Sequence, residues 1–225
     1  MDTETTGLDP AQGHRIVEIG GIELIRHVPT GRHFHEYINP ERDIPADAFA
    51  VHGLSADFLL AKRVFAEVVQ EFLDFVGDAT LIFHNAAFDV AFLNAELAFL
   101  SRQKIRPERV IDSLLLARQR HPMAPNSLDA LCKRYGIDNS RRRKHGALLD
   151  AELLSEVYIE LIGGKQPALT LAGIPRDRQA AAAAVPRLLP PRPHALPARL
   201  TLQEIADHDL MIDSLGATSL WRINA

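Results

Sequence analysis

The stretch TLIFHNAAFDVAFLNAELAFL, residues 80–100, decides the fold class of this chain. TLIFHN is a short apolar run that ends in polar residues, which is typical of a buried strand. The residues that follow it carry an apolar stripe at helical spacing: Phe88, Phe92, Ala95 and Phe99. A strand that runs directly into an amphipathic helix predicts an α/β unit.

The rest of the chain continues this alternation. Further strands are predicted at 15–25, at 33–38 as its hairpin partner, and around 109–113. Further helices are predicted at 64–76, near 113–120, near 127–135 and at 146–162. Strands that alternate with helices predict an α/β fold with a mixed sheet.

Composition sets limits on the class of protein. A chain of 225 residues, 47% hydrophobic and 24% charged, is long enough for one substantial core and a tail. The only cysteine, Cys132, excludes an intramolecular disulfide and favours the cytoplasm; it is predicted to be a core thiol. The net charge of −4 argues against a broad surface for polyanions, so a nucleic acid must be bound locally or through metal.

Acidic side chains occur where the functional edge of the sheet is expected. Asp2 and Glu4 would project from one side of an extended segment, and they repel each other unless a cation or a proton intervenes. Asp89 lies just inside the helix that follows TLIFHN. The competing interpretation of Asp89 is a favourable interaction with the N-terminus of that helix.

The segment HGALLDAELLSEVY contributes a histidine and another carboxylate. Asp150 shares a helix face with Leu154, Val157 and Tyr158, so it is predicted to point towards the core, where a carboxylate needs a partner. His145 is predicted to lie at or before the first turn of this helix. Asp47 and His52 are predicted to lie in a loop around AFAVHGL.

The motifs DTETTG, HNAAFD and HGALLD, in this order, resemble those of the DEDD-type 3′→5′ exonucleases of ribonuclease H-like fold. His145 marks the histidine subclass. The resemblance covers nearly the whole chain and implies a mixed sheet flanked by helices over residues 1–164. Because an apolar run normally precedes D-x-E in this family, we expect a truncated first strand here, and a native protein with several more apolar residues before Asp2.

The resemblance also implies roles for individual residues. It makes Asp2, Glu4, Asp89 and Asp150 ligands of two divalent cations, Mg²⁺ or Mn²⁺, and His145 the general base. Hard cations of this kind select carboxylate oxygens. Residues expected to bind the terminal nucleotide of the substrate are Asp2, Glu4, Thr5, Asp47 and His52. The basic run at 141–144 is interpreted either as a guide for the strand or as a solvated loop.

The C-terminal part is predicted to make contacts with other proteins. Residues 165–172 resemble a sliding-clamp-binding peptide, with Gln166, Leu169 and Leu171 as its contacts. Residues 173–199 form an Ala/Pro-rich flexible linker. Residues 200–225 resemble a tail that binds the catalytic alpha subunit of a replicative polymerase. A small theta-like subunit is compatible with the resemblance.

The predicted function is proofreading: hydrolysis of mispaired 3′-terminal nucleotides of DNA to nucleoside 5′-monophosphates. One alternative is a free-standing exonuclease of the same superfamily that trims RNA or DNA. A stand-alone nuclease needs neither a clamp peptide nor a polymerase-binding tail. Another alternative is a non-catalytic bridge between clamp and polymerase, and a bridge has no need for a carboxylate at Asp150 on a core face.

Overall fold

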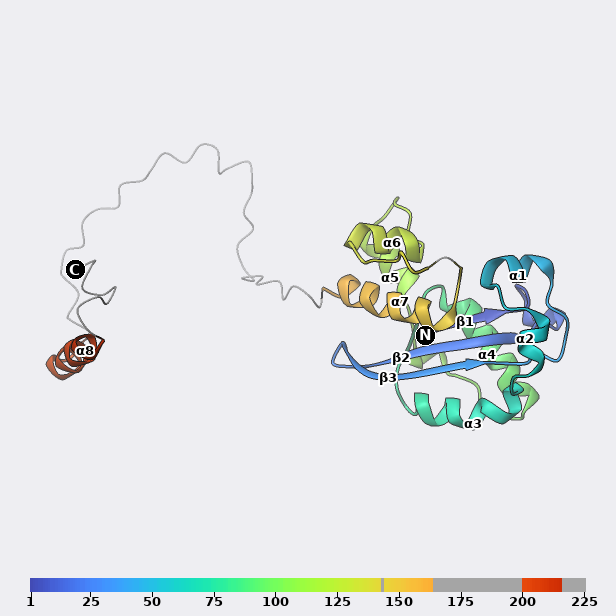
Figure 1. The fold of residues 1–225 in the computed structure, drawn as a ribbon, viewed down its shortest axis with the longest axis horizontal. Coiled ribbons are helices and arrows are strands. Elements are labelled where there is room, and N and C mark those ends of the chain that lie inside the picture. The colour runs from blue at the N-terminus through green and yellow to red at the C-terminus, as the bar shows by residue number, and fades with distance from the viewer. Residues whose placement is uncertain (143, 164–199, 216–225) are drawn as a thin grey trace. The chain divides into compact units, whose positions relative to one another are not determined.

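The computed structural model describes residues 1–142, 144–163 and 200–215 (Figure 1). The chain divides into two units, residues 1–170 and 171–225, which are considered separately. The predicted clamp contacts Gln166, Leu169 and Leu171, the linker 173–199 and the end of the tail lie outside the described residues.

The strands of the first unit form an antiparallel and a parallel ladder. β1 (Asp2–Thr5), β2 (Ile16–Ile25) and β3 (Val28–Tyr37) pair antiparallel in the order β1-β2-β3. β4 (Leu81–Phe83) and β5 (Val110–Asp112) pair in parallel. The predicted strands are present, although β3 begins five residues before the predicted 33–38 segment, because a turn at Arg26 and His27 closes a longer hairpin.

Helices cover both faces of the three-stranded sheet. Their bounds are α1 (Ala46–His52), α2 (Ala56–Leu60), α3 (Phe65–Val76), α4 (Ala86–Phe99), α5 (Ser113–Arg120), α6 (Leu128–Tyr135) and α7 (Ala147–Leu161), with 3₁₀ turns η1 (Pro10–Gln12) and η2 (Pro107–Arg109). Ile19 packs in one core cluster with residues of α3 and α4. The next residue, Gly20, faces α7, and a Cβ at this position would lie 2.2 Å from the backbone of Ala147. Since successive side chains of a strand alternate, α7 lies opposite α3 and α4 (Figure 1).

A second cluster of buried residues joins α5, α6 and α7. Cys132 is fully buried in it, which confirms the predicted core thiol. Asp150 faces inward with Leu154 and Val157, as the helical spacing predicts. The α/β fold is therefore confirmed, with Asp150 buried in the first turn of α7.

The prediction of a loop for Asp47 and His52 is wrong. Both residues lie in the short helix α1, Asp47 in its first turn and His52 in its last. Pro45 precedes the helix, and Gly53 ends it with φ of 77°. A helix of seven residues is too short to produce a clear periodic pattern, but a proline before it and a left-handed glycine after it are typical boundaries.

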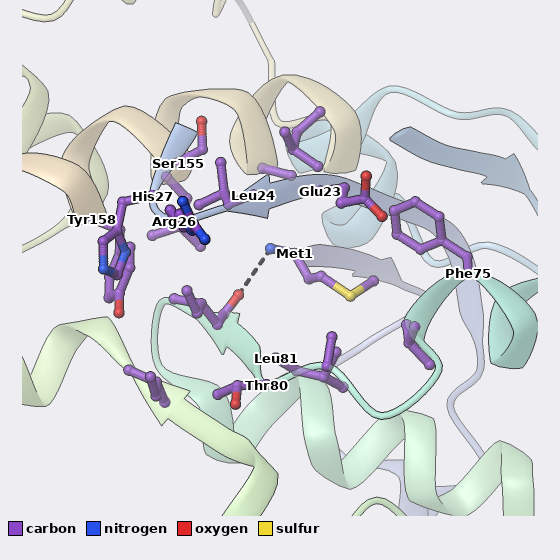
Figure 2. Close-up of a pocket in the computed structure, with 17 residues that line it drawn as sticks. Met1, Glu23, Leu24, Arg26, His27, Phe75, Thr80, Leu81, Ser155 and Tyr158 are labelled. Carbon is purple, nitrogen blue, oxygen red and sulfur yellow. Dashed lines mark hydrogen bonds between the residues drawn. The ribbon is translucent and has the colours of Figure 1, made fainter. Parts of the chain in front are cut away.

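The N-terminus lies buried between β2 and β4. The Met1 ammonium donates a hydrogen bond to the Ile82 carbonyl at 2.8 Å and so links β1 to β4 (Figure 2). Burial lowers the pKa of this ammonium. Beyond Met1 lies a cavity of about 400 Å³, lined mainly by apolar residues of β2, β4, α7 and the end of α3. β1 itself has four residues, whereas its partner β2 has ten.

The described part of the second unit is one helix, α8 (Leu202–Ser214). Thr201 and Glu204 form a capping box at its start. Its exposed apolar side chains include Leu202, Leu210 and Met211. No helix among residues 1–142, 144–163 and 200–215 has the length and apolar character that would let it cross a membrane.

Candidate active site

β1 supplies the first two carboxylates of the site. Asp2 and Glu4 are two residues apart in the strand, so they project from the same face. A register shift between Glu4 and Thr5 interrupts the ladder with β2 at this point. The Oε1 atom of Glu4 is buried and has no hydrogen-bond partner among the described residues. A buried carboxylate oxygen without a partner indicates a ligand that the protein itself does not provide.

α4 places the third carboxylate beside β1. Asp89 lies in the first turn of this helix and is buried. Its Oδ1 atom accepts hydrogen bonds from the Thr3 amide at 3.0 Å and from the Thr3 hydroxyl at 2.8 Å. Both hydrogen bonds go to Oδ1, so Thr3 leaves the Oδ2 atom of Asp89 available to another partner. Asp89 therefore contacts β1 in addition to any interaction that it has with the N-terminus of α4.

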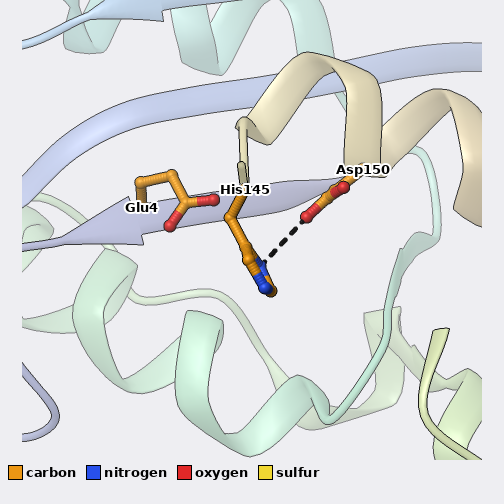
Figure 3. A group of neighbouring side chains, drawn as sticks. All are labelled: Glu4, His145 and Asp150. Carbon is orange, nitrogen blue, oxygen red and sulfur yellow. Dashed lines mark ion pairs between the residues drawn. The ribbon is translucent and has the colours of Figure 1, made fainter. Parts of the chain in front are cut away.

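α7 and the residues just before it complete the site. Asp150 is 2% exposed, in the first turn of α7. His145 lies just before the helix, and its amide donates to the Val51 carbonyl of α1 at 3.2 Å. Its Nδ1 atom is 3.4 Å from Asp150 Oδ2. Ligand atoms of Glu4, His145 and Asp150 all lie within 4.8 Å of one another (Figure 3).

A pocket of about 320 Å³ opens over this group. Its lining includes the predicted site residues Asp2, Glu4, Thr5, Asp47, His52, Asp89 and His145. Asp150 is not among the lining residues, but its Oδ2 atom lies 3.4 Å from the Nδ1 atom of His145, which is one of them. The structure therefore brings together segments that are far apart in the sequence.

Two residues of the pocket wall have polar atoms that can meet a substrate. His52 accepts a hydrogen bond from the Leu54 amide on Nδ1, and its Nε2 is buried without a partner among the described residues. Asp47 is exposed in the first turn of α1 and accepts from the Ala48 amide. The Thr5 hydroxyl donates to the Gly7 carbonyl, so this side chain shapes the turn after β1.

Burial raises the pKa values of three of the carboxylates, and neighbouring negative charges add to this effect for Asp2 and Glu4. Burial, followed by the charges of Asp150 and Glu18, raises the pKa of Glu4 to about 8. Burial also raises the pKa of Asp89 to about 7 and that of Asp2 well above its usual range, the latter with help from the Asp89 charge. Raised pKa values in a group of buried carboxylates, together with the unpartnered Oε1 atom of Glu4, fit a site for divalent cations.

Sequence reasoning missed Arg142 as a site residue. Its guanidinium donates from Nε to Asp150 Oδ1 at 2.5 Å and from Nη2 to Asp150 Oδ2 at 2.7 Å. Nη2 also lies 2.9 Å from His145 Nδ1, and Nη1 pairs with Asp129 at 2.7 Å. The only signal was the basic run next to His145, and this residue is neither a solvated side chain nor free to guide a strand.

The raised pKa values predict that the metal-free protein becomes less stable as the pH rises. Between pH 4.5, the ordinary pKa of a glutamate, and about 8, folded Glu4 keeps a proton that the unfolded chain has released. Stability is therefore lost as the pH rises through this range. We expect the melting temperature in chelator to fall from pH 5 to pH 8, and to fall less in Glu4→Gln. A wild-type melting temperature that rises over this range would contradict the assignment.

Comparison with known proteins identifies the family of this chain. The family model described as Exonuclease matches residues 1–158. The DNA polymerase III subunit epsilon of Rickettsia prowazekii is 54% identical over 180 residues, 79% of each chain. That of Escherichia coli K12 is 42% identical over 233 residues, which cover 99% of this chain and 96% of the relative.

Solved structures show the same fold at low identity. Exonuclease X in complex with 5′ overhanging duplex DNA matches with a TM-score of 0.58 and 24% identity, covering 72% of this chain and 89% of that one. The nuclease domain of 3′hExo, a DEDDh family member bound to rAMP, matches with a TM-score of 0.61 and 19% identity, covering 72% and 90%.

The fold and the site define a metal-dependent 3′→5′ exonuclease of the DEDD type with a histidine beside its fourth carboxylate. This chain belongs to the exonuclease family and, within it, to the DNA polymerase III epsilon subunits.

Proposed function

We propose that this chain removes mispaired nucleotides from the 3′ terminus of DNA during replication and releases nucleoside 5′-monophosphates. The observation that carries this proposal is that Asp2, Glu4 and Asp89 line one pocket, while Asp150 of α7 has a carboxylate oxygen within 4.8 Å of ligand atoms of Glu4 and His145. The relatives named DNA polymerase III subunit epsilon support the replicative setting.

The four carboxylates are the proposed ligands of two Mg²⁺ or Mn²⁺ ions. The fit rests on the unpartnered Oε1 of Glu4 and on the burial of Asp89 and Asp150. When bound, such ions supply positive charge to the phosphodiester and favour the deprotonated form of the attacking water. Their positive charge would also offset the effects of burial and of neighbouring carboxylate charges, which raise the pKa values of Asp2 and Glu4.

His145 is the proposed general base. Its side chain is 50% exposed and lines the pocket, so solvent and substrate reach it, while its main chain is held against α1. Asp150, 3.4 Å from Nδ1, orients the ring and stabilises the imidazolium that forms when the ring takes a proton from water. An imidazole side chain can accept and release protons near neutral pH, which suits it to this transfer.

The pocket wall formed by the end of β1 and by α1 is the proposed site of the terminal nucleotide. The buried Nε2 of His52 provides a polar contact at this wall. Asp47 and the segment around Thr5 lie on the same lining. A substrate hydrogen bond to Nε2 would satisfy a nitrogen that is otherwise unpaired among the described residues.

Residues outside the nuclease domain, proposed as 1–164, are assigned to assembly. We propose that residues 165–172 bind the sliding clamp, with Gln166, Leu169 and Leu171 in contact, and that residues 173–199 are a linker. Residues 200–225, which include the apolar side chains of α8, bind the alpha subunit. A tether of this kind raises the effective concentration of the nuclease at the polymerase. A theta-like third subunit and a cytoplasmic setting belong to the same proposal.

Deletion of residues 198–225 is expected to abolish co-elution with the alpha subunit and to leave hydrolysis of short single strands unchanged. The reason is that the described site lies wholly before residue 164. The matched variant, Gln166→Ala with Leu169→Ala, should weaken only clamp-dependent assembly. Gel filtration with purified alpha subunit and clamp measures both effects. A truncated chain that still co-elutes with the alpha subunit would refute the role of the tail.

The substrate is tested by direct competition. Purified chain with Mg²⁺ or Mn²⁺ is offered a DNA primer with a mispaired 3′ terminus, the matched primer, and an RNA oligonucleotide of the same sequence. We expect the mispaired DNA to be degraded fastest. Faster degradation of RNA than of either DNA would favour a free-standing RNA-trimming enzyme, and degradation of none of them would favour a non-catalytic bridge.

A further inference from the structure

Arg142 lies three residues before His145, the proposed general base. Its side chain is only 8% exposed. All three guanidinium nitrogens are engaged: Nε and Nη2 by Asp150, Nη1 by Asp129, with Nη2 also in contact with His145. A planar fork that meets both oxygens of a carboxylate is the strongest form of such a pair.

This contact explains why Asp150 differs from the other carboxylates of the site. Burial alone would raise the pKa of Asp150, but hydrogen bonds from His145 and Arg142 outweigh burial and hold this pKa below its usual range. The pKa values of Asp2, Glu4 and Asp89 are raised instead. A buried carboxylate that stays ionised needs a nearby positive charge, and Arg142 provides it.

The same contact prevents Asp150 from binding a cation and His145 from accepting a proton at Nδ1 at the same time. The guanidinium engages both Asp150 oxygens and lies against Nδ1 of His145, so the proposed ligand and the proposed base are both occupied. A divalent cation at Asp150 and the guanidinium of Arg142 would also repel each other, because both are positively charged. Asp129, whose side chain is 57% exposed, already pairs with Nη1 and can hold the guanidinium after its contacts with Asp150 are lost.

We propose that Arg142 is a positioning residue that takes the place of a cation at Asp150 in the metal-free site and gives up Asp150 when a divalent cation binds, while it keeps Asp129. The proposal rests on the metal dependence of the proposed function. It means that the metal-free site is stabilised in a closed, inactive arrangement, and that metal affinity is reduced by competition with the protein's own arginine.

The test measures Mn²⁺ binding by calorimetry and melting temperature in chelator, both without DNA. Arg142→Ala is expected to lower the melting temperature of the metal-free protein, because a buried pair loses one partner. The same variant should bind Mn²⁺ more tightly, on the order of tenfold, because the competitor is gone. Its melting temperature should therefore rise more on Mn²⁺ addition than that of wild type.

Two further variants make the result decisive. Arg142→Lys keeps the charge but loses the two-pronged contact, so it should lie between wild type and Arg142→Ala in both measurements. It also serves if Arg142→Ala does not fold. Arg141→Ala removes an equal charge from a side chain that is 76% exposed and should change neither quantity.

A purely structural role makes the opposite prediction for metal binding. If Arg142→Ala and Arg142→Lys lower the melting temperature but bind Mn²⁺ with unchanged or weaker affinity than wild type, the proposal is wrong. Because no nucleic acid is present, this outcome is separate from failure of the proposed function, which would appear as loss of nuclease activity in the wild-type chain.

Discussion

Asp2→Ala, Glu4→Ala and Asp150→Ala are each expected to abolish nuclease activity with Mg²⁺. All three carboxylates are proposed metal ligands, and a carboxylate oxygen of Glu4, one of Asp150 and a ring nitrogen of His145 lie within 4.8 Å of one another. Removal of one ligand displaces the cation and also leaves the phosphodiester without its main source of positive charge. Release of a 3′-labelled nucleotide, followed over time at saturating Mg²⁺, measures the loss.

The loss must be separated from unfolding and from loss of assembly. Glu4 carries a pKa raised to about 8 by burial, so its removal relieves an unfavourable charge and the metal-free variant should stay folded. Asp74→Ala is the control, because Asp74 is an exposed acid on α3 that contacts Gln70 and is not in the pocket. All variants should still bind the alpha subunit. Near-normal activity in any ligand variant would remove that residue from the metal site.

His145→Ala is expected to reduce turnover by roughly 10²–10⁴-fold, the usual range for loss of a general base, with little change in metal affinity. The experiment must also test whether His145 is itself a metal ligand, because one of its ring nitrogens lies within 4.8 Å of carboxylate oxygens of Glu4 and Asp150. Turnover and Mn²⁺ affinity should be measured on the same preparation.

The two roles of His145 separate cleanly in that experiment. A lost base lowers turnover and leaves the Mn²⁺ affinity intact. Collapse of Mn²⁺ affinity in His145→Ala would instead make this residue a ligand, and the general base would have to be sought elsewhere in the pocket.

Local sequence patterns predicted the positions of individual side chains, whereas the grouping of these residues into one site came from the resemblance of the three motifs to a known family. Alternation in an extended segment placed Asp2 and Glu4 on one side, and helical spacing placed Asp150 inward with Leu154. The junction at TLIFHN placed Asp89 in the first turn of a helix. Periodicity depends only on residues that are close in the chain, so it was sufficient to predict on which side of its own strand or helix each of these side chains lies.

The parts that were missed depend on contacts between distant segments. α1 is too short for a periodic signal, and its position is fixed by contacts such as His145 to Val51. Arg142 looks like any residue of a basic run until α6 brings Asp129 to its other side. The link from Met1 to Ile82 likewise joins residues that are 81 positions apart. No local pattern encodes these pairings.

The most direct test of the account is the identity of the product released from a mispaired 3′ terminus. Wild-type chain is mixed with a primer whose last nucleotide is mispaired and labelled, in Mg²⁺ and in chelator, and the product is identified by chromatography. The account predicts a labelled nucleoside 5′-monophosphate in Mg²⁺ and no release in chelator. Release in chelator, or a product with a 3′-phosphate, would contradict metal-dependent hydrolysis at the site formed by Asp2, Glu4, Asp89 and Asp150.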